Sequence, residues 1–147
     1  MVYLKIFRQR ITTIYSKMEW NTSNNNKEKM TVINGSHFSN LEGFYEEVSR
    51  LFLKDENWKV GTLDGFDDLL YGFQGEIIWK NSQKSKKELG FNLTKEFYET
   101  KIRQGKPFNI ELIQQKLNEL MEGNGQTLFE ILIEIIESHK NIKLILD

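Results

Sequence analysis

The 147-residue sequence contains no cysteine, and its only histidines are His37 and His139. A chain without cysteine forms no disulfide bond and has no thiol nucleophile, which is typical of proteins from a reducing compartment. Two histidines are too few for a histidine-rich metal site. We therefore expect a cytoplasmic protein that needs neither disulfides nor a cofactor.

Long hydrophobic runs are also missing. No apolar stretch approaches the roughly 18 residues of a membrane-spanning helix, and Arg8 and Arg10 interrupt any signal-peptide core near the N-terminus. The net charge is −1, so the chain as a whole lacks the basic excess of nucleic-acid-binding proteins. We predict neither a membrane nor a nucleic acid as a direct partner.

The familiar catalytic motifs are absent as well. The glycines of residues 72–75 precede a predicted strand, and the Gly-Asn-Gly of residues 123–125 is not followed by Lys and Ser or Thr, so neither segment is a phosphate-binding loop. No serine lies in a G-x-S-x-G turn, and no histidine pair has metal spacing on a helix. We therefore predict that the chain is not an enzyme.

The length suits one domain with a single core. Residues 1–29 have a net charge of +4 and end in an asparagine-rich polar tract, which has little apolar surface to bury. We expect residues 1–29 to be a flexible N-terminal extension and residues 30–147 to form the domain.

Hydrophobic spacing predicts strands that alternate with helices. The predicted strands cover residues 31–33, 76–79 and 142–146. The predicted helices cover residues 41–52, 62–71, 82–90, 94–104, 109–122 and 128–138. Right-handed crossovers would join such strands into a parallel sheet. The fold class is therefore predicted to be α/β, with a small three-stranded parallel sheet flanked by helices.

Capping residues indicate where several helices begin. Ser39 and Glu42 have the spacing of a capping box. Thr62 and Thr127 each precede a helical pattern, and either Asn81 or Ser82 is suited to cap the short basic helix.

Charge is unevenly distributed along the chain. Residues 55–76 sum to −5, whereas residues 77–106 sum to +5. Such blocks are typical either of a surface that steers a charged partner or of ordinary solvated helix faces. The acids of the first block are Asp55, Glu56, Asp64, Asp67, Asp68 and Glu76.

Three of these acids, Asp64, Asp67 and Asp68, lie within five residues. They can bind a cation, act as an acid–base pair, or form an anionic surface for a basic partner. The helix dipole explains Asp64 in the first turn but explains mid-helix Asp68 less well. Trp58 and Phe73 bracket this helix, either as interface anchors or as core residues.

The segment from residue 58 to residue 75 resembles the barstar family of ribonuclease inhibitors. The matching steps are Leu63-Asp64, Asp68, Leu70, Gly72 and Phe73. Similarity extends to Ile33-Asn34-Gly35, to the strand containing Trp79 with Ser82 after it, and to the final Ile145-Leu146-Asp147. The resemblance covers about residues 30–147.

The resemblance implies a barstar-like fold and a role in binding a protein. Members of the family occupy the active site of a basic ribonuclease, with helix-borne carboxylates where RNA phosphates bind. Carried over, Asp64 and Asp68 would be the central anions, with Asp68 placed most deeply. Trp58 and Phe73 match family aromatics, and Glu134 matches a peripheral glutamate.

The sequence departs from the family at several positions. Thr62 replaces a family Asn, Asp67 replaces a Trp, and the loop glycine is displaced to Gly61. Residues around 91–123 form a helical insertion that can cover or extend the binding face.

We expect an inhibitor of a barnase-type ribonuclease, of the extracellular or toxin kind. Such a chain would serve as an immunity protein in a toxin–antitoxin pair, and we expect it to be a monomer when free. Two alternatives stay open: a metal-dependent hydrolase that uses Asp64, Asp67 and Asp68, and a non-catalytic interaction module that binds through the insertion.

Overall fold

The computed structural model describes residues 29–147, and the following account concerns that part of the chain. Strands β1 (Lys29–Asn34), β2 (Gly75–Lys80) and β3 (Ile142–Leu146) form one parallel sheet in the order β1-β2-β3. This confirms the predicted fold class. The extension predicted for residues 1–29 lies outside the described residues, apart from Lys29, which is the first residue of β1 and pairs with Gly75.

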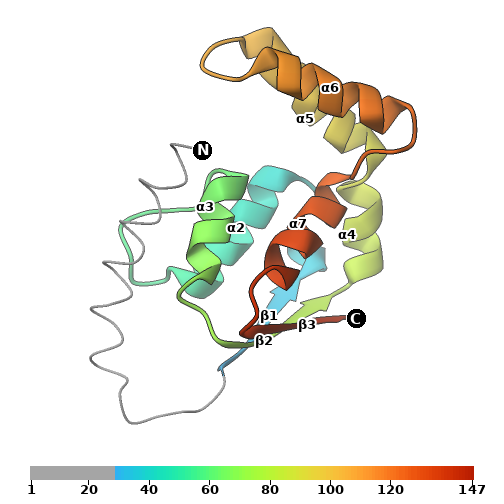
Figure 1. Cartoon of the computed structure of the whole chain (residues 1–147). Coiled ribbons are helices and arrows are strands. Elements are labelled where there is room, and N and C mark those ends of the chain that lie inside the picture. The colour runs from blue at the N-terminus through green and yellow to red at the C-terminus, as the bar shows by residue number, and fades with distance from the viewer. Residues whose placement is uncertain (1–28) are drawn as a thin grey trace.

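Helices connect the strands and lie together on one face of the sheet. Figure 1 shows α2, α3, α7 and α4 side by side above the strands. The bounds are η1 (Gly35–His37), α2 (Leu41–Phe52), α3 (Leu63–Leu70), α4 (Ser82–Glu88), α5 (Phe91–Gln104), α6 (Ile110–Met121) and α7 (Leu128–Glu137). Among residues 29–147, no helix is both long and apolar enough to cross a membrane.

Most predicted helix starts are correct, with three corrections. Asn81 precedes α4 but its side chain makes no capping hydrogen bond, and the Ser82 hydroxyl donates to the Asp147 carbonyl instead. Thr62 and Thr127 cap α3 and α7 as predicted, each accepting a hydrogen bond from a backbone N–H three residues later. The cap of α2 is Asn40 and not Ser39, since the Asn40 side chain accepts from the Gly43 N–H at 2.8 Å. Helix α5 begins three residues earlier than predicted.

The core is centred on Trp79 of β2, which is completely buried, as its position in a predicted strand indicates. Its ring stacks on Phe44 of α2 at 5.4 Å between centroids and meets Phe129 of α7 edge-on at 5.2 Å. The indole N–H donates to the Ser85 hydroxyl of α4 at 3.0 Å. One side chain of the central strand therefore contacts three helices.

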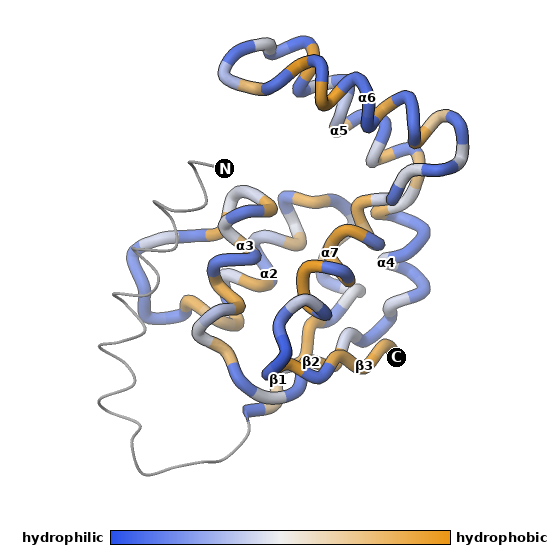
Figure 2. The backbone as a smooth tube through the Cα atoms, in the orientation of Figure 1, coloured by the Kyte–Doolittle hydropathy of each residue, from blue (hydrophilic) through white to orange (hydrophobic). Residues whose placement is uncertain are grey.

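Residues 91–123, which we predicted to be a helical insertion, contain the helical hairpin of α5 and α6. It projects from the rest of the domain, and its far end reaches back above α3 (Figure 1). Its colours alternate between hydrophobic and hydrophilic, whereas α7 is largely hydrophobic (Figure 2). Within the hairpin, the Lys101 ammonium lies over the rings of Phe97 and Phe108, at 4.7 and 4.4 Å from their centroids.

Gly75 at the start of β2 provides a test of the sheet register. Its φ is +138°, and an added Cβ would lie 2.0 Å from the Lys29 carbonyl oxygen. We expect Gly75→Ala to lower the free energy of unfolding by about 1–3 kcal/mol, measured by urea denaturation. Gly61→Ala is the control, because an added Cβ there meets no atom within 4 Å. Equal unfolding midpoints for the two variants would contradict this register.

Candidate protein-binding surface

Helix α3 presents its polar side chains on a narrow arc. Thr62 fixes the start of the helix, since its hydroxyl accepts from the Gly65 N–H at 2.9 Å. Phe66, Leu69 and Leu70 are buried and hold the opposite side against the core. After the Thr62 cap, the partly or fully exposed polar positions of residues 63–71 are Asp64, Asp67 and Tyr71.

Asp64 lies in the first turn of α3 and is partly exposed. Burial raises the pKa of Tyr45 in α2, and the nearby charges of Glu42 and Asp64 raise it further. Burial lowers the pKa of Lys101 in the hairpin, while the Asp64 carboxylate acts in the opposite direction. Asp64 is thus within electrostatic reach of both α2 and the hairpin.

Asp68 does not share the exposed face of Asp64, contrary to the expectation that the two carboxylates are the central anions of one binding surface. Its side chain is 0% exposed. Four residues advance an α-helix by about 40° beyond a full turn, and this rotation carries Asp68 from the edge of the exposed arc to the buried side. Asp68 cannot touch a partner in this conformation, so any effect it has on binding must pass through the position of α3.

Asp67 lies against the loop that joins α7 to β3. The His139 Nε2–H donates to Asp67 Oδ1 at 2.8 Å, and the His139 ring meets the ring of Tyr71 edge-on at 4.6 Å. The histidine side chain is only 9% exposed. Asp67 therefore connects α3 to the segment before the last strand, besides contributing negative charge.

The two aromatics that bracket α3 differ in their surroundings. Phe73 is 7% exposed and packs edge-on against Phe52 at 5.2 Å, so it belongs to the core. Trp58 is half-buried against the core and keeps part of its surface accessible. Of the two, Trp58 has the surface for a partner to contact.

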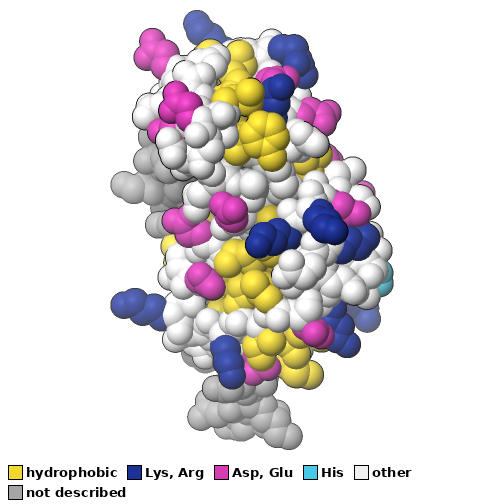
Figure 3. Space-filling model, turned by 90° about the vertical axis from the view of Figure 1, so that its right-hand side faces the viewer, with side chains coloured by type: hydrophobic (Ala, Val, Ile, Leu, Met, Phe, Trp, Pro, Cys, Tyr) yellow, Lys and Arg dark blue, Asp and Glu magenta, His cyan; other side chains and the backbone are white. Residues whose placement is uncertain are grey.

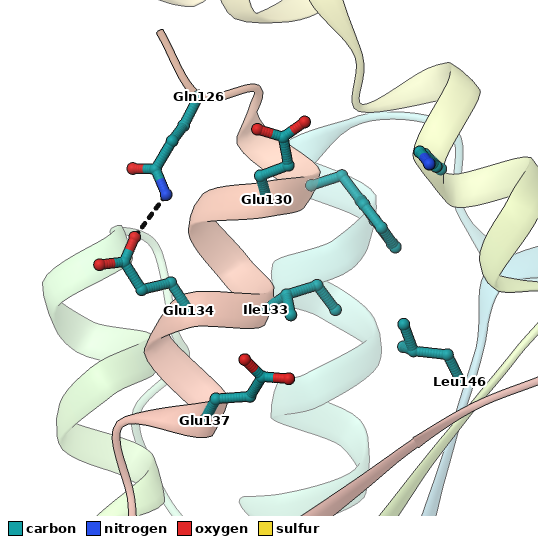
Figure 4. Close-up of a pocket in the computed structure, with 8 residues that line it drawn as sticks. Gln126, Glu130, Ile133, Glu134, Glu137 and Leu146 are labelled. Carbon is teal, nitrogen blue, oxygen red and sulfur yellow. Dashed lines mark hydrogen bonds between the residues drawn. The ribbon is translucent and has the colours of Figure 1, made fainter.

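Glu134 lies on the exposed side of α7, which packs against α3. The Gln126 amide donates to its carboxylate, as the dashed line in Figure 4 shows. Glu130 and Glu137 lie on the same helix and form an exposed acidic stripe with Glu134. We call Asp64, Asp67 and Glu134 the acidic face.

The three aspartates do not converge on one point. Asp64 is partly exposed, Asp67 bonds to His139, and Asp68 is buried. Within residues 29–147, no group of three or more acidic, histidine or cysteine side chains is arranged to hold a metal ion.

Sequence reasoning assigned no role to either histidine, yet both are bonded to acids. His37 Nδ1 lies 3.0 Å from the buried Glu47 carboxylate, which also accepts from Arg50 at 2.9 Å. His139 and Asp67 are 72 residues apart in the sequence, so the spacing of neighbouring residues does not predict their contact.

No protein-family model matches the chain, and comparisons with curated proteins and with solved structures also gave no match.

Replacing Asp64 and Asp68 separately by alanine distinguishes a surface carboxylate of α3 from a buried one. We expect Asp68→Ala to lower the free energy of unfolding by about 1–3 kcal/mol, because it empties a buried polar position. Asp64→Ala should cost less than about 1 kcal/mol, the usual contribution of an anion in the first turn of a helix. Urea denaturation of the full chain measures both. Equal losses would show that Asp68 is not a buried structural group.

Proposed function

We propose that this chain is an inhibitor that binds a basic, barnase-type ribonuclease through the acidic face and blocks its active site. The observation that carries the proposal is the packing of α3 against α7, which brings Asp64 and Glu134 onto neighbouring helices. The similarity of residues 58–75 to the barstar family supports the same role.

The physical basis is mimicry of phosphate. A nuclease must gather arginine and lysine to hold RNA, and carboxylates held in fixed positions can accept charge-assisted hydrogen bonds from these residues. A net −5 over residues 55–76 also favours rapid association with a basic protein. The lysines of α4 lie on the other side of α7 from α3 (Figure 1), so they do not repel a basic partner that approaches α3. The cations of α5 belong to the hairpin, and Lys101 among them is within electrostatic reach of Asp64.

The six expected contact residues divide into two groups under this proposal. Asp64, Glu134 and Trp58 have accessible surface and contact the nuclease, with Asp67 contributing charge beside them. Asp68 and Phe73 are buried and hold α3 and the chain after it in place. The central anion of the face is accordingly Asp64, in place of Asp68.

The hairpin of α5 and α6 modifies this face. The ammonium of Lys101 interacts electrostatically with the Asp64 carboxylate. It therefore competes with the cationic side chains of a partner for that carboxylate. A partner has to fit beside the end of the hairpin that reaches above α3 (Figure 1). We infer that the hairpin selects which ribonuclease is bound, and that the chain is an immunity protein for such a nuclease.

Inhibition of RNA cleavage tests the proposal. The full chain, titrated into a basic ribonuclease of the barnase type, is expected to suppress cleavage, and more strongly at low salt. Asp64→Asn and Glu134→Gln should each weaken inhibition about tenfold, which corresponds to about 1.4 kcal/mol.

The matched control is Glu122→Gln, which also removes an exposed acid but at the end of α6 from which the chain runs on to α7. It should inhibit as well as the unaltered chain, because it leaves the acidic face intact. If all three variants inhibit alike, or if cleavage proceeds unchanged in excess inhibitor, the proposal is wrong.

The chain alone should not cleave RNA, and added Mg²⁺ should leave its thermal midpoint unchanged. Both expectations follow from the proposal that Asp64 contacts the cationic side chains of a partner and does not take part in metal-dependent hydrolysis. Cleavage that survives purification and disappears in Asp64→Asn would instead favour the metal-dependent hydrolase.

A further inference from the structure

A groove runs beside α7 on the side away from α3. Its floor is apolar, with Phe129 and Ile133 of α7 and Leu146 of β3, and its volume is about 450 Å³. Glu130 and Glu137 stand along the α7 side (Figure 4), and Lys86 of α4 also lines the groove. In Figure 3 a hydrophobic patch at mid-height likewise has acidic side chains on one flank and basic ones on the other.

The groove adjoins a strand with an open edge. Within residues 29–147, β3 pairs only with β2, so it is an edge strand of the sheet. The Asn141 carbonyl accepts from Gly75 N–H, and Asp147 N–H donates to the Trp79 carbonyl. Backbone groups alternate in direction along a parallel pair, so those of Leu144 and Leu146 point to the open edge.

Side-chain directions on β3 follow the same alternation. Leu144 packs against the core and Leu146 lines the groove, so both face the helices. Lys143 and Ile145 consequently face away from them. A strand added beside β3 would therefore place every second side chain in the groove and the others beside Ile145.

We propose that this edge and groove bind an extended segment of another protein in which β-branched and basic residues alternate. The segment adds a fourth strand to the sheet through the backbone of Leu144 and Leu146. Its arginine or lysine stems cover Ile133 and Leu146, and their charged ends reach Glu130 and Glu137. Its β-branched residues lie next to Ile145.

Charge decides which occupant fits. The carboxylates of Glu130, Glu134 and Glu137 outweigh the single ammonium of Lys86 along the groove, which favours a basic segment over an acidic one. A second copy of β3 is a poorer match, because its only cation, Lys143, faces away from the helices. Glu134 belongs to both surfaces, but the inference is tested separately from the proposed inhibition, since the backbone of β3 and the residues Glu130 and Glu137 are not part of the acidic face.

Binding of a synthetic peptide tests this inference. The probe is a fluorescent, capped (Val-Arg)₄ peptide, and the comparison peptide is (Val-Glu)₄. We expect the full chain to bind the arginine peptide in an anisotropy titration at least tenfold more tightly than the glutamate peptide. Hydrogen exchange at the Leu144 and Leu146 amides should slow when the arginine peptide binds, because both N–H groups become paired.

Two variants separate the backbone from the charge contribution. Leu146→Pro removes an N–H that points to the open edge, which an edge strand tolerates, and Glu130→Gln/Glu137→Gln removes two carboxylates. Each should weaken peptide binding at least tenfold, whereas Lys143→Ala, on the other face, should not. An arginine peptide that carries N-methyl groups on alternate residues tests the backbone contact without changing the protein.

The inference is overturned if both peptides bind equally, or if the variants and the N-methylated peptide bind as well as the originals. It is also overturned if the arginine peptide does not bind while sedimentation shows that the chain pairs with itself. Slowed exchange only at α3 would place the peptide on the acidic face instead.

Discussion

The packing of Trp79 is the constraint on which the arrangement of the helices depends. The indole lies on the central strand, stacks on α2, meets α7 edge-on and donates its N–H to α4. Large aromatic side chains dominate core energetics, and a buried indole N–H needs an acceptor. Because α2 and α7 supply the aromatic contacts of Trp79 and α4 supplies its hydrogen-bond acceptor, these three helices have little freedom to shift relative to the sheet.

The acidic face is a consequence of that layer. Phe44 links Trp79 to Phe66 of α3 at 5.0 Å between ring centroids, and Phe129 links Trp79 to α7. Each of these helices buries its apolar side and leaves acids on the other. The hydrogen bond from His139 to Asp67 then connects α3 to the chain that leaves α7. Preorganisation of carboxylates on two packed helices is what a phosphate-mimicking surface requires.

Local sequence patterns predicted much of the fold but less of the candidate site. Apolar spacing and the caps Thr62 and Thr127 predicted the strands, α3 and α7, because these features act within a few residues. The burial of Asp68 was not predictable. Asp68 is rotated by only about 40° from Asp64 around the helix axis, and whether that position is buried depends on the elements that pack against α3. The same holds for Asp67 and His139, whose contact spans 72 residues, and for the groove beside β3, which three elements form together.

The central claim is that the acidic face occupies the place of RNA phosphates in a ribonuclease active site. The most direct measurement is the dissociation constant of the chain and a barnase-type ribonuclease, determined with and without a mononucleotide that fills that active site. Competition predicts that the apparent constant rises in proportion to one plus the ratio of nucleotide concentration to its own dissociation constant. A constant that stays unchanged at saturating nucleotide would contradict the account.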